Sequence, residues 1–331
     1  MNGPSHNYAF PASDALRLLA RPVIAVVIAA VALHLADRLE WLPAPVPANL
    51  DQTILSTKAR LALRKSPASI LLLGDSSCLM DVEARDLAAQ LGNLPTLNLG
   101  TLSYLDLETQ SRLLAKALAA HPFQPPRTVV LLLHPEALRG SSPSPTHIAF
   151  LDAQLSTPGS RLAASQALNR LESALAGVTF RERIIQPFIP VPLHGDWSTA
   201  YGCNLHLAQI LLHRDGSLSD PTRPDPHALL GNAEYRLGNG IEPASRAFRH
   251  AIPNGTRLAI GITPTPQSLA SNKHSENIRR MLGTWSTWIG ADRVLTNLPP
   301  VMPDSKFATH THLNAEGARE FTARLAEALR E

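Results

Sequence analysis

Short apolar runs alternate along this chain with segments in which apolar residues recur at helical spacing. The runs have the length and composition of buried parallel strands and lie at 69–73, 96–100, 128–133, 257–262 and 294–296. The helical patterns follow them at 81–91, 105–120, 275–289 and 315–329. Such an alternation predicts an α/β fold with a mostly parallel sheet.

Residues 141–254 interrupt this alternation. They are rich in Ser, Pro, Gly, Ala and His and show helical patches at 160–175 and 205–212, without a strand and helix repeat. We interpret them as a large insertion that folds over the sheet.

An apolar segment at 16–39 precedes the α/β pattern. No charged residue occurs from Pro22 to Ala36, and the segment has roughly the 20 residues that a bilayer core requires. Arg17 and Arg21 lie at its start and favour a cytoplasmic N-terminus. We expect a single transmembrane signal anchor, with residues 1–15 as a cytoplasmic tail. A cleaved signal peptide and a buried core helix are the alternatives.

A proline-rich stretch at 42–47 follows the apolar segment and is expected to be extended and stiff. We interpret residues 40–68 as a linker and lead-in, and residues 69–331 as the α/β domain that carries the insertion. With the anchor inserted as predicted, this domain lies in the periplasm, outside a bacterial inner membrane.

Composition narrows the classes of function. The net charge is +3, and the basic residues are scattered, which gives nucleic-acid binding no support. Two cysteines far apart, Cys78 and Cys203, are expected to be free thiols rather than a disulfide or a metal site. His310 and His312 lie two residues apart and no spacing suggests a third ligand, so neither a metal nor another cofactor is expected.

The sequence Gly74-Asp75-Ser76-Ser77 directly follows the first predicted strand. Ligands of open α/β sheets bind at this end of the strands, so a serine here is a candidate nucleophile. These residue types also favour ordinary turns, which is the alternative interpretation.

Two histidines, His310 and His312, lie just before the last predicted helix. Taken alone, they belong equally well to a helix cap. Together with Ser76, however, they suggest a nucleophile and its general base brought together by the fold.

Gly74-Asp75-Ser76 resembles the first sequence block of the SGNH (GDSL-type) hydrolase superfamily, and His312-Leu313-Asn314 resembles its last block. The resemblance implies a flavodoxin-like three-layer sandwich, with Ser76 as nucleophile and His312 as base. It also implies that the backbone N–H groups of Ser76 and Gly100 form an oxyanion hole.

The sequence departs from the family in two places. The third predicted strand runs into His134, where the family has an oxyanion-hole Asn. His134 is either a donor that replaces this Asn or a residue that caps the strand end. Ala308 and Thr309 occupy the positions where the family has an Asp before the base, and Asp304 is the nearest upstream carboxylate. We take Asp304 as the candidate orienting acid.

An anchor followed by an outer SGNH-like domain resembles accessory proteins of bacterial exopolysaccharide systems, cellulose synthesis among them. The resemblance implies an esterase or O-acyltransferase that acts on an acylated polysaccharide beside a membrane-bound O-acyltransferase and a polysaccharide synthase. The alternative is a catalytically degenerate scaffold or glycan-binding subunit, because both departures weaken the catalytic machinery.

Overall fold

The structure, a computed structural model, describes residues 12–38, 47, 49–64, 66–103, 105–140, 143–156, 204–219 and 235–330. The chain divides into two compact units. Helix α1 (Ala12–Arg38) belongs to the first, and the other helices and strands described below belong to the second.

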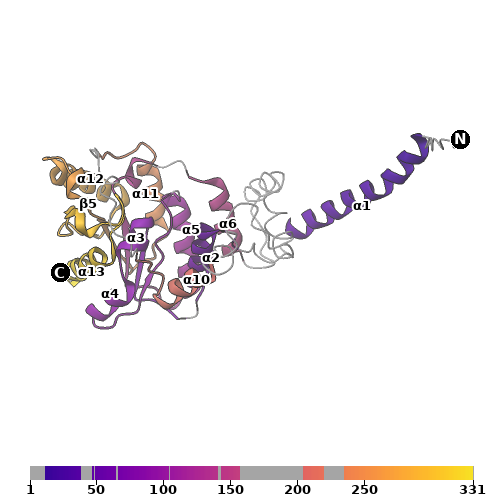
Figure 1. Ribbon diagram of the computed structural model, residues 1–331. Helices are drawn as coiled ribbons and strands as arrows, with labels where there is room; N and C mark the ends of the chain where they lie inside the picture. The colour runs from indigo at the N-terminus through magenta and orange to yellow at the C-terminus, as the bar shows by residue number, and fades with distance from the viewer. Residues whose placement is uncertain are drawn as a thin grey trace. The chain divides into compact units, whose positions relative to one another are not determined.

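Five parallel strands form the central sheet of the second unit, in the order β2-β1-β3-β4-β6. Helices surround this sheet (Figure 1). The order is that of flavodoxin-type doubly wound sheets, and the predicted α/β class is confirmed. All five predicted strands are present: β1 (Ile70–Gly74), β2 (Thr96–Asn98), β3 (Thr128–Leu133), β4 (Arg257–Ile262) and β6 (Arg293–Val294).

Helices cover both faces of this sheet, so the strands are apolar on both sides rather than alternating. Ile70 and Leu72 pack into one core, and Leu71 and Leu73 pack into the other. The first core is closed by α3 (Ser76–Asp81), α4 (Ala84–Gln90) and α13 (Ala315–Arg330). The second is closed by α2 (Leu50–Ala62), α5 (Leu107–Ala119), α6 (Pro145–Leu155), α10 (Asn204–His213), α11 (Ile241–His250) and α12 (His274–Ile289).

The strand order places the topological switch point between β1 and β3. The chain leaves β1 towards one edge of the sheet, to β2, and then returns to pair β3 on the other side of β1. Loops diverge at such a point and leave room for a ligand beyond the carboxyl ends of the strands. Gly74 and Leu133 end the two strands.

Within the predicted linker and lead-in at 40–68, residues 50–62 form a helix that was not predicted, α2. Asn49 caps this helix, since its side chain accepts a hydrogen bond from the N–H of Gln52 at 2.9 Å. Leu55 and Ala59 are buried in the core. The apolar positions of α2 are interspersed with buried Thr and Lys, which hid the helix from a search for apolar periodicity.

The described part of the insertion belongs to the helical layer on one face of the sheet. The predicted patch at 205–212 is present as α10, whereas the patch at 160–175 lies outside the described residues. Phe150 of α6, Leu211 of α10 and Phe248 of α11 enter the same core as the strands. A small parallel pair, β5 (Thr265–Pro266) with β7 (Val301–Met302), was not predicted.

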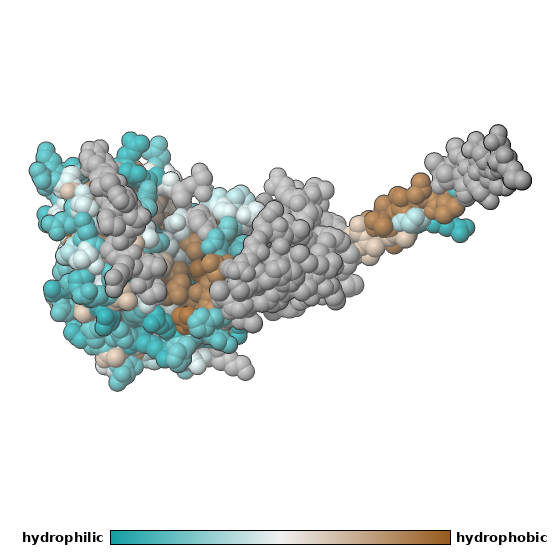
Figure 2. Space-filling model, in the orientation of Figure 1, coloured by the Kyte–Doolittle hydropathy of each residue, from teal (hydrophilic) through white to brown (hydrophobic). Residues whose placement is uncertain are grey.

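Helix α1 has 27 residues and contains Pro22. Its large apolar side chains, among them Val23, Val26 and Ile28, are 51–68% exposed (Figure 2). Within the described residues, however, no helix meets the combined requirement of length and apolar character for a bilayer span. The transmembrane anchor is therefore not confirmed and stays a prediction.

A buried lysine joins α2 to the sheet. Lys58 is fully buried, and its Nζ donates to the carbonyl oxygens of Asn98 at 2.9 Å and Gly216 at 2.6 Å. Burial lowers the pKa of this amine to about 7. The amine therefore loses its proton in the folded protein at a pH where an unfolded chain, with a pKa of about 10.4, keeps it.

This difference makes the free energy of unfolding depend on pH. Between pH 7 and 9 the unfolded state binds the additional proton, so we expect Lys58 to add roughly 2 kcal/mol of stability as the pH rises through this window. Above pH 9 the buried thiol of Cys78, whose pKa is raised, opposes the trend. Urea unfolding of the wild type and of Lys58→Met at several pH values measures the effect. The variant should lose the slope, and equal slopes would contradict the assignment.

Candidate active site

Ser76 begins α3 directly after β1, and Asp75 fixes this junction. The Oδ1 atom of Asp75 accepts the N–H of Ser77 at 3.0 Å and so caps α3. Its Oδ2 atom accepts the N–H of His134 at 2.9 Å, which ties the end of β1 to the end of β3. The carboxyl is buried, and burial raises its pKa to about 6.

His312 lies on the loop before α13, and Asn314 caps that helix by accepting the N–H groups of Glu316 and Gly317. The Nε2 atom of His312 is 2.9 Å from the Oγ atom of Ser76, although the two residues are 236 positions apart. Both side chains are half-buried and so are partly exposed to solvent. The structure thus brings together the predicted nucleophile and the predicted base.

Two side chains of α3 hold the loop of His312 in place. Ser77 Oγ donates to the carbonyl oxygen of Thr311 at 2.9 Å, and Asp81 Oδ1 accepts the N–H of Leu313 at 2.8 Å. The Oδ2 atom of Asp81 is buried without a hydrogen-bond partner among the described residues. Burial raises the pKa of this carboxyl well above its usual value, which favours the neutral acid.

The Nδ1 atom of His312 lies 3.2 Å from the hydroxyl of Thr309. The candidate orienting acid, Asp304, is engaged elsewhere, since its Oδ1 accepts the N–H of Ser268 at 2.9 Å. The structure therefore corrects the prediction: Thr309, not Asp304, contacts the side of the imidazole that faces away from Ser76.

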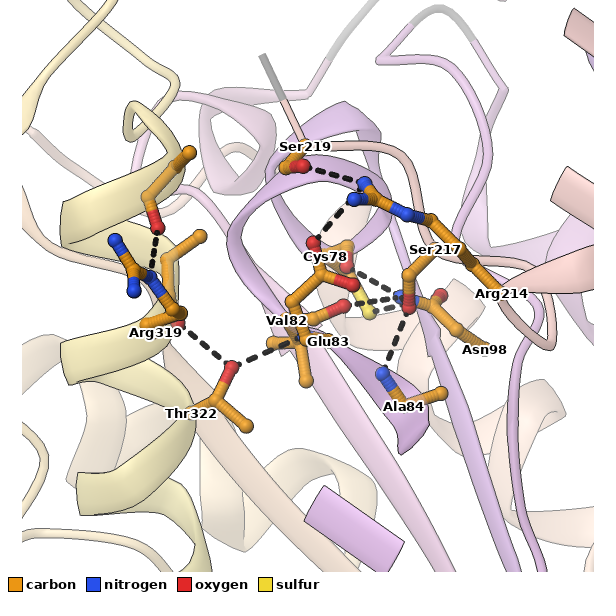
Figure 3. A network of polar contacts seen from close by, with 12 residues as sticks. Cys78, Val82, Glu83, Ala84, Asn98, Arg214, Ser217, Ser219, Arg319 and Thr322 are labelled. Atoms are coloured by element: carbon orange, nitrogen blue, oxygen red, sulfur yellow. Dashed lines mark hydrogen bonds and ion pairs between the residues drawn. The ribbon is translucent and has the colours of Figure 1, made fainter. Parts of the chain in front are cut away.

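The predicted oxyanion donor Gly100 is also engaged elsewhere. Its N–H donates to Asn98 Oδ1 at 2.8 Å. Asn98 is itself buried, and its amide donates to the carbonyl oxygens of Cys78 and Val82 (Figure 3). This network holds neighbouring main-chain segments together and occupies the Gly100 N–H. The prediction that this N–H is an oxyanion donor is therefore wrong. Ser76 lies in the first turn of α3, where an N–H has no acceptor within the helix.

His134 lies directly after β3, and its two ring nitrogens differ in their contacts. Its Nδ1 atom accepts the N–H of Glu136 at 3.3 Å, as a capping residue would. Its Nε2 atom is buried and has no hydrogen-bond partner among the described residues. Burial, and then the charges of His312 and His310, lower the pKa of the ring to about 3, so it is neutral.

Sequence reasoning missed Ser77, Asp81 and Thr309. Thr309 precedes His312 by three residues, a spacing that allows a side chain to turn back onto the ring, so a signal was present. Nothing in the sequence distinguishes Asp81 from an ordinary helix-end acid. Its role depends on a contact with Leu313, 232 positions away.

Two comparisons with known proteins found no match. No protein-family model matches the chain, and no curated protein matches it either.

Proposed function

We propose that this protein is a serine-dependent esterase or O-acyltransferase that acts on acyl esters of an exopolysaccharide. The observation that carries the proposal is the 2.9 Å contact between Ser76 Oγ and His312 Nε2, at the carboxyl edge of a doubly wound sheet. The resemblance of the sequences around Ser76 and His312 to SGNH hydrolases adds support.

In the proposed reaction Ser76 Oγ attacks the acyl carbon while His312 Nε2 takes the hydroxyl proton. The bond between the acyl carbon and the sugar oxygen then breaks, and His312 returns the proton to that oxygen. This leaves an acyl-serine. Water or a second sugar hydroxyl, deprotonated by His312, attacks the acyl-serine and regenerates Ser76. Water gives an esterase, and a sugar hydroxyl gives a transferase.

A non-catalytic scaffold or glycan-binding subunit is the second candidate. Two observations favour it: a hydroxyl rather than a carboxylate lies at the 3.2 Å contact with His312 Nδ1, and the N–H of Gly100 is occupied by Asn98. Both weaken the machinery that acyl transfer requires.

The acyl content of the exopolysaccharide made by the host cell separates the two candidates. If the protein is an enzyme, the acyl content in cells that carry Ser76→Ala should equal the acyl content in cells that lack the whole gene. A scaffold should keep its effect in the Ser76→Ala cells and lose it only with the gene. Wild-type acyl content in cells that contain Ser76→Ala protein at the wild-type amount would refute the proposed enzymatic role.

Membrane anchoring, a periplasmic α/β domain and partnership with a membrane-bound O-acyltransferase and a polysaccharide synthase belong to the same proposal. The exposed apolar side chains of α1 support the anchoring, because burying them in an apolar environment is favourable. Membrane fractions washed with alkaline carbonate should retain the full-length protein. Complete release into the wash would contradict anchoring.

A further inference from the structure

The buried Nε2 atom of His134 is unusual because polar atoms in protein interiors almost always have partners. His134 is 3% exposed, and Nε2 has no hydrogen-bond partner among the described residues. A buried donor without a partner is costly. Nε2 of His274 is also buried without a partner among the described residues, but His134 directly follows β3, at the edge of the sheet where ligands of open α/β folds bind.

The hydrogen bond at Nδ1 indicates which ring nitrogen carries the proton. Because Nδ1 accepts the N–H of Glu136, it carries a lone pair, and in a neutral ring the single proton is then on Nε2. The ring stays neutral over the physiological range, since burial and the neighbouring charges of His312, His310, His274 and Arg139 all disfavour the imidazolium. His134 therefore offers a fixed N–H donor.

The backbone of His134 is held close to the residue that precedes the nucleophile, and aromatic contacts hold its ring. Its backbone N–H is bonded to Asp75, the residue before Ser76. Tyr235 packs against the ring in a T-shaped contact with 5.7 Å between ring centroids, and His274 makes a similar contact with Tyr235 at 5.8 Å. Arg139 lies over the Tyr235 ring at 5.4 Å. A donor held in this way needs little rearrangement when charge develops nearby.

We propose that the Nε2–H of His134 donates a hydrogen bond to the acyl oxygen of the substrate and stabilises the negative charge that forms there when Ser76 attacks. This role rests on the proposed function. It supplies a donor where the N–H of Gly100 cannot, and it makes His134 a catalytic residue.

The test compares full-length wild-type protein with His134→Phe in its reaction with a fluorophosphonate, whose phosphoryl oxygen gains negative charge as Ser76 attacks. His134→Phe keeps a ring against Tyr235 and removes the donor. We expect its maximal labelling rate to fall about 10²-fold, with the half-saturating probe concentration changed by less than about threefold. His274→Phe is the matched control, because it changes the other histidine that packs on Tyr235, and it should label within about fivefold of wild type.

Equal labelling rates for wild type and His134→Phe, with labelling abolished in Ser76→Ala, would overturn the role of His134 alone. Absence of Ser76-dependent labelling in the wild type would overturn the proposed function and this role with it. A second measurement uses the wild-type protein itself. In a ¹⁵N spectrum of histidine-labelled protein, Nε2 of His134 should be protonated and Nδ1 should not. The signals that disappear in His134→Phe identify this residue. The opposite tautomer would overturn the proposal.

Discussion

Replacing Thr309 with aspartate should accelerate the reaction of Ser76 by about 10²-fold. The Thr309 hydroxyl lies 3.2 Å from His312 Nδ1 and also accepts the N–H groups of Thr311 and His312, at 3.3 and 3.1 Å. With its lone pairs used in this way, the hydroxyl can donate its own hydrogen to Nδ1. That arrangement favours the tautomer with a proton on Nε2, so the tautomer that accepts the proton of Ser76 in the proposed reaction is the minor form in the wild type.

A carboxylate at position 309 only accepts hydrogen bonds, so it would hold the proton on Nδ1 and leave the Nε2 lone pair facing Ser76. It would also stabilise the imidazolium that forms during attack. In a serine protease, losing this carboxylate costs about 10⁴-fold in kcat, so recovering part of it is a large effect.

The rate of fluorophosphonate labelling measures this change. Thr309→Asn is the matched control, because it has the shape of aspartate without the charge, and it should stay within about tenfold of wild type. If Thr309→Asp and Thr309→Asn label equally fast, the orienting group at Nδ1 does not limit the reaction and our account of Thr309 is wrong.

Gly74→Ala should reduce the free energy of unfolding by about 3 kcal/mol or more. A Cβ atom at this position would lie 1.8 Å from the carbonyl oxygen of Leu132 and 2.6 Å from Cys78 Cβ. The φ angle of Gly74, +154°, is also one that side-chain-bearing residues rarely adopt. The backbone of β3 is fixed by its pairing with β1 and β4, so it cannot move away cheaply.

Gly283→Ala is the control for this substitution. Gly283 lies inside α12, and a Cβ atom there meets nothing within 4 Å. It should raise the free energy of unfolding by about 0.5–1 kcal/mol, the usual gain for Ala over Gly in a helix. Urea unfolding of the full-length variants measures both changes. A Gly74→Ala protein as stable as the wild type would show that β1 and β3 do not approach as closely as described.

The sheet was predictable from sequence because its strands are buried on both faces and therefore appear as uninterrupted apolar runs. Ile70–Gly74 and Thr128–Leu133 are examples, and both are bounded by turn-forming or polar residues. Helix α2 was not predictable in this way. Its buried face includes Thr57, which bonds to the carbonyl oxygen of Thr53 in the same helix, and Lys58, which bonds to the carbonyl oxygen of Asn98 that only the folded chain brings near.

The pairing of Ser76 with His312 was predictable because Ser76 follows a predicted strand and His312 precedes a predicted helix. The groups around the pair depend on side-chain contacts that no sequence spacing reveals. Asp304 is a carboxylate upstream of His312, but its bond to Ser268 directs it elsewhere. Gly100 follows β2 as an oxyanion donor would, but the side chain of Asn98, two residues earlier, turns back and takes its N–H.

His134 illustrates the same limit. The sequence shows that a histidine ends the third strand, but not which nitrogen is occupied. The bond from Glu136 to Nδ1 and the burial of Nε2 are both properties of the folded site.

Reaction with a fluorophosphonate probe shows directly whether Ser76 is an activated nucleophile. Full-length wild-type protein should react with a fluorophosphonate probe, and mass spectrometry should map the adduct to Ser76. Ser76→Ala should abolish labelling, and His312→Ala should slow it by at least about 10²-fold. Ser286→Ala, which removes a hydroxyl that bonds only within α12, should label at the wild-type rate. Wild-type protein that is not labelled, or an adduct that persists in Ser76→Ala, would contradict the account.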